Sequence, residues 1–330
     1  ELNLVAEDTN QYGSDRRDGS NLASLLRELA DIEGLRWIRL LYCYPSYFSE
    51  ELIDEIAKNE KVCKYIDIPL QHAHNLTLLA MNRPPAAHTR TLLDTLRARI
   101  PGLALRTTFI SGFPGESEEA HAELVDFAAT MAFERMGAFA YSPEDGTPAA
   151  LYPEQVDAGA RAARRDELVS LQQEIGARFA ESLVGTEVDV LIDGYDEEED
   201  EDEGEGEGEG GARRRQLIGR TQWDAPDVDP LAFVSPEWLC DAERRERGGP
   251  PSSSSPSGPP SPEPFVPSRP PPTPGMMVRC LVTSASLFDL EVTPIEVVAD
   301  SWAGVEGEEC ERSGSGGAAG ASSRELATAR

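Results

Sequence analysis

The sequence predicts an α/β fold followed by a smaller all-β unit. In residues 1–184, short apolar runs alternate with single amphipathic helical patterns, whereas residues 185–298 contain only strand patterns. Strands separated by single helices pair in parallel through right-handed crossovers. We therefore expect a doubly wound sheet or a partial (βα) barrel, with its functional face at the carboxyl ends of the strands.

Each element of the first unit has a local signal. Leucines at positions 22, 25, 26 and 29 follow the spacing of an amphipathic helix, for which Ser20 is the expected cap, and Ser49 is expected to begin the next helix. Strands are predicted at 1–6, 37–44, 65–70, 103–110 and 134–142, and helices at 20–32, 49–59, 75–81, 87–100, 116–131 and 156–184.

The second unit has the pattern of a small β-barrel with two insertions. Its strands are predicted at 186–192, 216–221, 277–285 and 287–298. The acidic insertion 196–215, the Pro- and Ser-rich insertion 241–275 and the tail 299–330 are predicted to be disordered. We interpret the Pro-rich run as a spacer in preference to a ligand for a partner. The predicted domains are therefore 1–184 and 185–298.

The net charge of -30 argues against a partner gripped through its phosphates, because such binding needs clustered Lys and Arg. Residues 196–210 contain eleven of the carboxylates. A basic protein surface fits this charge better than nucleic acid does. No apolar run is long enough to cross a membrane and no basic leader is present, so a membrane partner is not expected.

The cysteines give no metal-binding pattern. Their spacing matches no zinc or iron–sulfur ligand set, so no metal ligand is predicted in this chain. We expect buried, reduced thiols, which indicate a reducing compartment, either the cytoplasm or an organelle such as a chloroplast or mitochondrion. The five cysteines are Cys43, Cys63, Cys240, Cys280 and Cys310.

Polar and aromatic residues follow the predicted strands, with glycines that would let a ligand approach the backbone. They include Glu7, Asp8, Tyr42, Tyr44, Gln71, His72, His74, Gly112, Phe113, Gly115, Glu116, Tyr141 and Ser142. The GFPGE stretch (112–116) also opens a helix, so its free amides could receive an anionic or carbonyl group. This set predicts a cavity for a polar, partly aromatic small molecule.

Plainer interpretations stay open for three of these features. GFPG can be only a turn, with Glu116 favouring the helix N-terminus electrostatically. Arg106, inside a strand, can be a satisfied salt bridge. His72 and His74 have the His-x-His spacing of a metal site but no evident third ligand, so we favour histidines that form hydrogen bonds inside the cavity.

Taken together, several stretches resemble the radical S-adenosylmethionine methylthiotransferases, and the RimO family above all. They are LVAEDTNQYG, WIRLLYCYPSYFSEELIDEIA, YIDIPLQHAHNLTLLAMNRP, LRTTFISGFPGESEEAHAELVDF, RMGAFAYSPEDGTPAA and GRTQWDAPDVD, in this order along the chain. The resemblance covers roughly 1–195 and 216–298. It implies a partial barrel that lacks its first strand, followed by a TRAM domain, which is a small OB-like β-barrel that contacts the substrate.

The resemblance also implies a cofactor and its contacts. S-adenosylmethionine would lie at the carboxyl ends of the strands. Its expected contacts are Glu7, Asp8, Gln71, His72, Arg106, Thr108, Phe109, Gly112, Phe113, Gly115, Glu116 and Tyr141. The chemistry implied is a 5'-deoxyadenosyl radical that abstracts hydrogen from the β-carbon of an aspartate in small-subunit ribosomal protein S12. The protein would then position that bond rather than act as acid or base, so no catalytic residue is nominated.

The sequence departs from the family in one respect. The family binds two 4Fe-4S clusters, one of them through a C-x-x-x-C-x-x-C loop, and neither ligand set is present here. We expect these cysteines upstream of Glu1 in the full-length protein, and we expect the chain alone to be inactive.

The substrate is a separate question, because related enzymes act on transfer RNA. The acidic stretch GRTQWDAPDVDP (219–230) resembles the RimO version, and no lysine occurs between Leu183 and Val298. These features favour a basic ribosomal protein over RNA. The alternatives are a transfer-RNA methylthiotransferase and a non-catalytic binding protein that carries a TRAM module.

Overall fold

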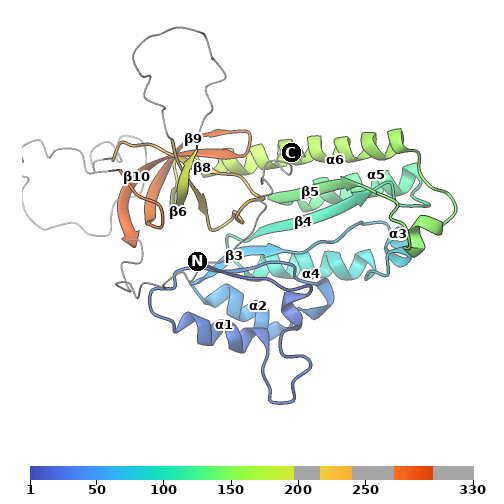
Figure 1. Ribbon diagram of the computed structural model, residues 1–330, viewed down its shortest axis with the longest axis horizontal. Coiled ribbons are helices and arrows are strands. Elements are labelled where there is room, and N and C mark those ends of the chain that lie inside the picture. The colour runs from blue at the N-terminus through green and yellow to red at the C-terminus, as the bar shows by residue number, and fades with distance from the viewer. Residues whose placement is uncertain (197–215, 240–270, 300–330) are drawn as a thin grey trace, which may run out of the picture.

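The computed structural model describes residues 1–196, 216–239 and 271–299 (Figure 1). The acidic run, most of the Pro-rich insertion, the tail, Cys240 and Cys310 lie outside the described residues, and so do the predictions made for them. In the part of the chain that is described, no helix is both long and apolar enough to span a membrane.

Five parallel strands form the first sheet in chain order, β1-β2-β3-β4-β5. They are β1 (Leu2–Leu4), β2 (Ile38–Leu40), β3 (Val62–Asp67), β4 (Ala104–Ser111) and β5 (Arg135–Ala140). A doubly wound sheet would reverse its strand order at a switch point, whereas this order never reverses. The partial (βα) barrel is therefore confirmed.

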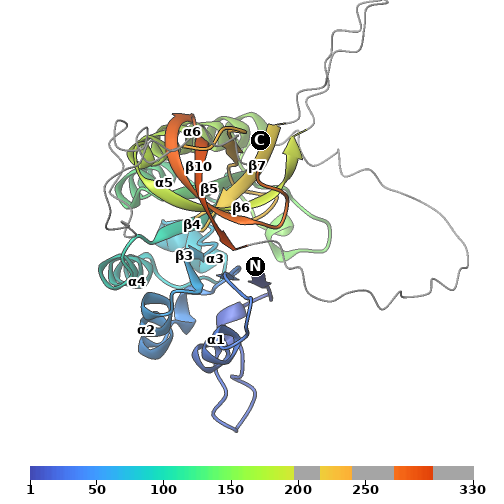
Figure 2. The ribbon, with the colours of Figure 1, turned by 90° about the vertical axis from the view of Figure 1, so that its left-hand side faces the viewer.

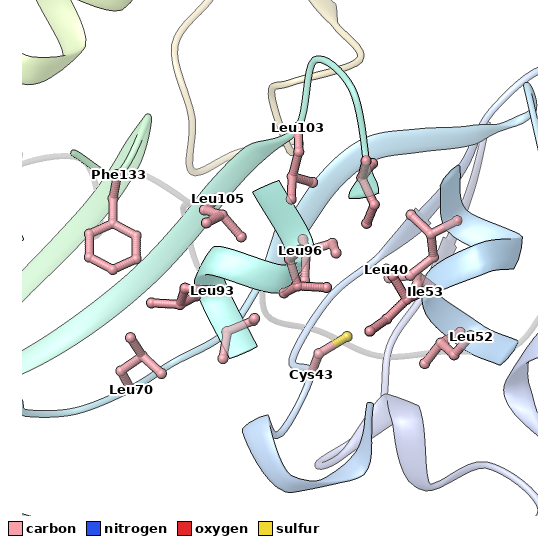
Figure 3. Packing of buried hydrophobic residues seen from close by; sticks show 14 of the residues in the cluster. Leu40, Cys43, Leu52, Ile53, Leu70, Leu93, Leu96, Leu103, Leu105 and Phe133 are labelled. Atoms are coloured by element: carbon pink, nitrogen blue, oxygen red, sulfur yellow. The ribbon is translucent and has the colours of Figure 1, made fainter. Parts of the chain in front are cut away.

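Helices and short turns connect these strands, and the last two lead from β5 to the second unit. They are η1 (Thr9–Gln11), α1 (Leu22–Ala30), η2 (Pro45–Tyr47), α2 (Glu50–Lys58), α3 (Asn75–Ala80), α4 (Ala86–Arg99), α5 (Glu118–Met131), η3 (Pro148–Leu151) and α6 (Ala158–Leu183). Leucines and isoleucines of α2 and α4 pack against one face of the sheet and form the main core, part of which Figure 3 shows.

Alternate residues of a strand point to opposite faces, which identifies the second face of the sheet. On β4, Leu105 and Phe109 belong to the core under the helices. Arg106 and Thr108 therefore lie on the other face, which we call the inner face. By the same alternation the inner face includes Arg39, Tyr65, Asp67, Arg135, Gly137 and Phe139.

Two predicted boundaries are wrong for local reasons. Asn21, not Ser20, begins α1, because its side chain accepts the Ser24 amide at 2.8 Å and the Ser24 hydroxyl accepts the Asn21 amide at 3.1 Å. β3 begins at Val62 rather than at residue 65. Lys64 is tolerated inside it because its ammonium donates to carbonyls at the end of α2. Ser49 begins α2 as predicted.

The second unit is a closed five-stranded barrel with strand order β10-β8-β7-β6-β9. Its strands are β6 (Glu187–Asp196), β7 (Gln216–Thr221), β8 (Ala232–Val234), β9 (Met277–Ser286) and β10 (Asp289–Ala299). The prediction of a small barrel is confirmed. The sequence pattern missed β8, because three residues are too few to show an alternation.

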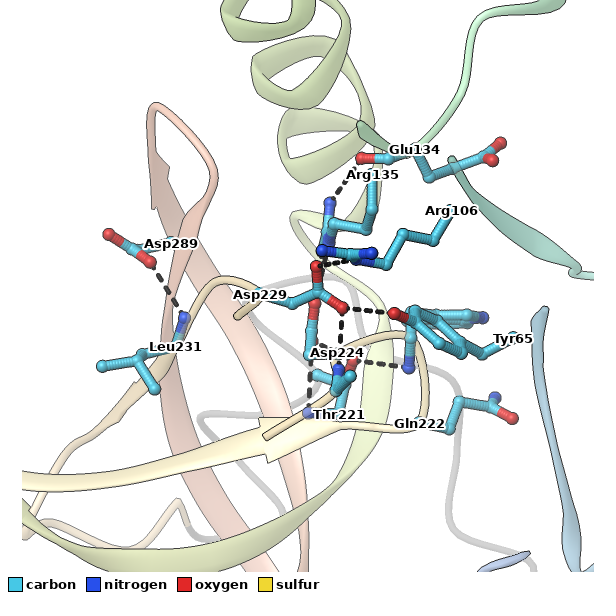
Figure 4. A network of polar contacts seen from close by, with 12 residues as sticks. Tyr65, Arg106, Glu134, Arg135, Thr221, Gln222, Asp224, Asp229, Leu231 and Asp289 are labelled. Carbon is cyan, nitrogen blue, oxygen red and sulfur yellow. Dashed lines mark hydrogen bonds and ion pairs between the residues drawn. The ribbon is translucent and has the colours of Figure 1, made fainter. Parts of the chain in front are cut away.

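The small barrel docks on the inner face near the amino ends of the strands (Figures 1 and 2). The segment that joins β7 to β8 carries the contact, which Figure 4 shows in part. Arg135 Nε donates to Asp224 at 3.0 Å, and the Tyr65 hydroxyl donates to Asp229 at 2.6 Å. Arg39, which is fully buried, donates to the carbonyls of Thr221 and Gln222. Every one of β2 to β5 thus contributes an inner-face side chain to this interface, since Arg106 also reaches Asp229.

Candidate functional site

Backbone hydrogen bonds tie the carboxyl ends of all five strands to their neighbours. After β1, the Thr9 amide donates to the Tyr42 carbonyl at 3.0 Å. The Cys43 amide then donates to the Asp67 carbonyl at 2.8 Å, which ties the end of β2 to that of β3. The remaining ends are joined by bonds from Gln71 N to Thr108 O and from Tyr141 N to Ser111 O, both of 2.8 Å. The sheet therefore presents its carboxyl ends as one connected edge.

The three central strands each end in a residue with positive φ. These are Tyr42 (56°), Gln71 (72°) and Gly112 (76°). The left-handed conformation suits glycine but costs about 1–2 kcal/mol for a residue with a side chain. Surrounding contacts must therefore hold Tyr42 and Gln71 in place, and strained residues of this kind concentrate at ligand sites.

The GFPGE turn is closed by its own glutamate. Glu116 Oε2 accepts the Gly112 amide at 2.7 Å and the Phe113 amide at 3.3 Å, while the Gly115 amide donates to the Glu154 carbonyl at 3.0 Å. The expectation that these amides are free for an anionic or carbonyl group is therefore wrong. Glu116 does more than favour the helix N-terminus, because α5 has its own cap in Ser117.

Glu116 is ionised in spite of its burial. Its side chain is fully buried, with Arg164 Nη1 at 3.0 Å and His72 Nε2 at 3.3 Å from its oxygens. Burial opposes the charge, but the nearby His72, the Gly112 amide and Arg164 together outweigh it, so the pKa of Glu116 lies below its usual value. The carboxylate is thus a fixed anchor for the turn.

The upper inner face, between this edge and the docked barrel, is partly exposed. Thr108 and Gly137 are paired across β4 and β5, and a side chain at Gly137 would come within 3.8 Å of the Thr108 hydroxyl. Phe139, next along the inner face, is 58 % exposed. At the rim, Tyr141 stacks edge-on against Phe113 at 5.2 Å, and its buried hydroxyl has no hydrogen-bond partner.

Eight of the twelve predicted contacts fall into three groups. Gln71, Thr108 and Tyr141 lie at or beside the open part of the inner face, with Phe113 and Gly112 at the same edge. Glu7 and Asp8 follow β1 at the outer end of that edge, where Glu7 is exposed and Asp8 accepts from Gln11. Gly115 lies on the far side of the turn, near Glu154.

Three predicted contacts are placed elsewhere by the fold. Phe109 is fully buried on the helix-covered face, where it packs edge-on against Phe127 and Phe133. His72 and Glu116 are buried against each other beneath the turn. The prediction that these three line the cavity is wrong, because the sequence pattern did not assign their faces.

Arg106 forms two salt bridges, as the plainer interpretation held. Its Nη1 lies 3.2 Å from Asp67 and its Nε lies 3.3 Å from Asp229 of the small barrel.

The histidine pair is held together by a local hydrogen bond, in which His72 Nδ1 accepts the His74 amide at 2.9 Å. Among the described residues, no group of three or more His, Cys, Asp or Glu is arranged to hold a metal ion.

The sequence reading also missed residues of this face. Asp67, Gly137 and Phe139 lie beside Arg106 and Thr108 on the inner face. Every second residue of a strand lies on the same face, so the alternation that starts at Arg106, carried across to the paired residues of β3 and β5, would have identified them. A glycine inside a strand, as at position 137, is itself a sign of close approach by a ligand or another backbone.

Comparison with known proteins agrees with this architecture. Residues 6–128 match the model of the Radical SAM superfamily. Two curated relatives, from Syntrophotalea carbinolica and Desulfitobacterium hafniense, are both named "Ribosomal protein uS12 methylthiotransferase RimO". Each is 43% identical to the chain, over 236 and 235 residues respectively, which is 71% of this chain and 49% of the relative.

Solved structures show only a partial likeness. The HemN coproporphyrinogen III oxidase of Escherichia coli, a radical SAM enzyme by its title, is 18% identical and has a TM-score of 0.38. It covers 48% of this chain and 37% of its own, too little to add to the sequence relatives. The chain spans about half the length of the curated relatives that it matches. On the strength of those relatives and of the superfamily match, the chain belongs to the RimO family of radical SAM proteins.

Proposed function

We propose that the protein to which this chain belongs transfers a methylthio group to the β-carbon of an aspartate in ribosomal protein S12. The observation that carries the proposal is the 43% identity over 236 residues with proteins named for this activity. A match of that length exceeds the half barrel of residues 1–184 and must extend into the second unit. The proposed domains are accordingly the half barrel and a TRAM module at 185–298.

The upper inner face fits S-adenosylmethionine as the cofactor. A flat group would lie against Gly137, which has no side chain, and the unpartnered Tyr141 hydroxyl offers a hydrogen bond to it. Gln71, Thr108 and Phe113 would complete the contacts. When bound, S-adenosylmethionine supplies radical chemistry at an unactivated C–H bond. The role of this chain is to hold the reacting groups together and to exclude water.

The described residues do not fit an iron–sulfur cluster. Cys43, Cys63 and Cys280 are buried, and burial raises the pKa of the Cys63 thiol to about 12, whereas cluster ligands are thiolates. Burial raises the pKa of the Cys43 and Cys280 thiols as well. A cluster, which the family implies, would take its ligands from other parts of the protein.

The charge of the small barrel supports a basic protein substrate. In its described ranges the only basic residues are Arg220 and Arg279, against eleven Asp and Glu, of which Asp224 and Asp229 are buried at the contact with the half barrel. Both arginines are already paired, Arg220 with Asp193 at 2.9 Å and Arg279 with Asp189 at 2.9 Å. Such a surface offers little to phosphates and suits a partner rich in Lys and Arg.

The test is an anaerobic assay of the cluster-reconstituted full-length protein with S-adenosylmethionine, a sulfide source and a reductant. We expect ribosomal protein S12 to gain one methylthio group in place of one hydrogen at an aspartate, read by tandem mass spectrometry. Transfer-RNA modification without protein modification would favour the transfer-RNA enzyme. Binding of S12 with no modification by the reconstituted protein would favour the non-catalytic alternative.

A further inference from the structure

A continuous series of polar contacts leads from the small barrel to the carboxyl ends of the strands. Asp229, on the segment between β7 and β8, accepts from Arg106 Nε at 3.3 Å (Figure 4). Arg106 Nη1 donates to Asp67 Oδ1 at 3.2 Å. The second oxygen of Asp67 accepts the Tyr42 amide at 3.1 Å. One arginine thus connects a carboxylate of the second unit to a carboxylate at the end of β3.

Solvent screens the charges of Asp229, Arg106 and Asp67 only weakly. The side chains of Asp229 and Asp67 are 4% and 3% exposed, and that of Arg106 is 18% exposed. At this burial a change in one charge is felt by its neighbours more strongly than it would be at the surface. Asp229 is also held by the Tyr65 hydroxyl and the Ala225 amide, so its position depends on how the small barrel docks.

The far end of the series is a strained residue at the candidate site. Tyr42 has a φ of 56° and its side chain is exposed. Its carbonyl accepts the Thr9 amide, so it joins the ends of β1 and β2. A non-glycine residue in this conformation persists only where its surroundings hold it. The Asp67 carboxylate is the side-chain partner of its amide.

We propose that Asp229 is a positioning residue for the strand ends, and that docking of the small barrel sets the geometry of Tyr42 through Arg106 and Asp67. Arg106 divides its donors between two carboxylates. Without the charge of Asp229, Arg106 turns fully toward Asp67 and rotates that carboxylate away from the Tyr42 amide. The view that these ends face the cofactor rests on the proposed function; the contacts themselves do not.

The test compares D229N with D224N by hydrogen–deuterium exchange of the Tyr42 amide, resolved by fragmentation mass spectrometry. Asp224 is the matched control, since it lies on the same segment, is equally buried and pairs with an inner-face arginine, Arg135. Among the described residues, Arg135 donates to Asp224 and to the Glu134 carbonyl and not to Asp67. We expect D229N to speed exchange at Tyr42 about tenfold, which corresponds to about 1.4 kcal/mol, and D224N to leave it within about twofold.

Two results would overturn the proposal. Equal acceleration in D229N and D224N would mean general loosening of the interface, and no change in D229N would mean that the series carries no coupling. If D229N fails to fold by circular dichroism, R106K replaces it, because lysine keeps the charge but cannot present two separate nitrogens to the two carboxylates. R106K should give the same acceleration, and its absence would again overturn the proposal.

A second readout connects the inference to the site. In the reconstituted full-length protein, we expect D229N to raise the Kd for S-adenosylmethionine about tenfold, while D224N stays within about twofold. Failure of cofactor binding in all variants including wild type would count against the proposed function alone. The exchange experiment, which needs no cofactor, would still decide the coupling.

Discussion

Glu116 shows how one buried side chain can anchor a turn. Its two oxygens accept from the backbone of Gly112 and Phe113 on one side and from Arg164 on the other. The carboxylate is fully buried, so each of these donors would be left unsatisfied if it were lost. The glutamate of GFPGE therefore acts on the turn itself, and through the turn on Phe113 and Tyr141.

E116Q should lower the free energy of unfolding by about 3 kcal/mol, since whichever oxygen becomes an amide group will face a donor. The measurement is urea unfolding at neutral pH. E118Q is the control: Glu118 pairs with the same Arg164 but is 82% exposed, so its loss should cost under about 1 kcal/mol. Equal losses in both variants would contradict the role given to Glu116.

The lowered pKa of Glu116 predicts that the stability of the fold depends on pH. Its folded pKa is depressed, so its stabilisation is complete above the ordinary pKa of 4.5 and is lost as the pH falls through the lower folded value. The difference in unfolding free energy between wild type and E116Q should therefore shrink as the pH drops below about 4.5. A difference that stays constant across this range would show that Glu116 is not a depressed acid.

At the scale of elements, α6 connects the turn to the small barrel. Its first turns carry Arg161, which packs on Gly112 and donates to the Tyr141 carbonyl, and Arg164, which binds Glu116. Its last turns place Ala180 in the core of the small barrel. At 1.5 Å per residue, its 26 residues span about 39 Å, so one helix reaches from the GFPGE turn to the small barrel (Figure 1).

G112A should test that packing. A methyl group there would lie 2.2 Å from Arg161 Cγ, at a φ of 76°. We expect a loss of about 2–4 kcal/mol in unfolding free energy, from strain and overpacking together. G19A is the matched control, with a φ of 85° and open space around it, and should lose only about 1 kcal/mol. Similar losses of unfolding free energy in G112A and G19A would mean that Arg161 moves away from the added methyl group at little cost.

At the scale of the molecule, buried ion pairs join the two units. Arg135 and Asp224 are 5% and 4% exposed, and both Arg39 and Arg106 also reach the segment between β7 and β8. Breaking a buried pair leaves an unpaired charge, which costs more than the pair itself contributes. The interface should therefore make the half barrel and the small barrel unfold together.

R135A should lower the unfolding free energy by about 3–5 kcal/mol, because Asp224 is left buried without its partner. The contacts of Arg39, Tyr65 and Arg106 remain, so calorimetry should still show a single transition, at a lower temperature. R27A removes two ion pairs with Glu51 and Glu55 outside the interface, where Arg27 itself is 48% exposed, and should change stability by under about 1 kcal/mol. An unfolding free energy of R135A within about 1 kcal/mol of wild type would contradict the role of this pair.

Much of the fold was predictable because its signals are local. The alternation of apolar runs with helices predicted all five strands and six helices of the half barrel, and the strand patterns after residue 185 predicted a small barrel. Boundaries were less exact where a side chain had two possible roles. Ser20 and Asn21 are both good caps, and only the reciprocal bond with Ser24 selects Asn21.

The sequence by itself determined the family, the parallel pairing of the strands and the segments whose ends form the candidate site. Tertiary structure decided which side chains face that site. Phe109 and Thr108 are adjacent in the chain, yet one is in the core and the other on the inner face. The link from Asp229 to Tyr42 joins residues far apart in sequence. Only packing brings Asp229 within hydrogen-bond distance of Arg106, Arg106 within reach of Asp67, and Asp67 within reach of the Tyr42 amide. Periodicity is a local property of the chain, whereas the pairing of buried charges depends on the docking of the two units.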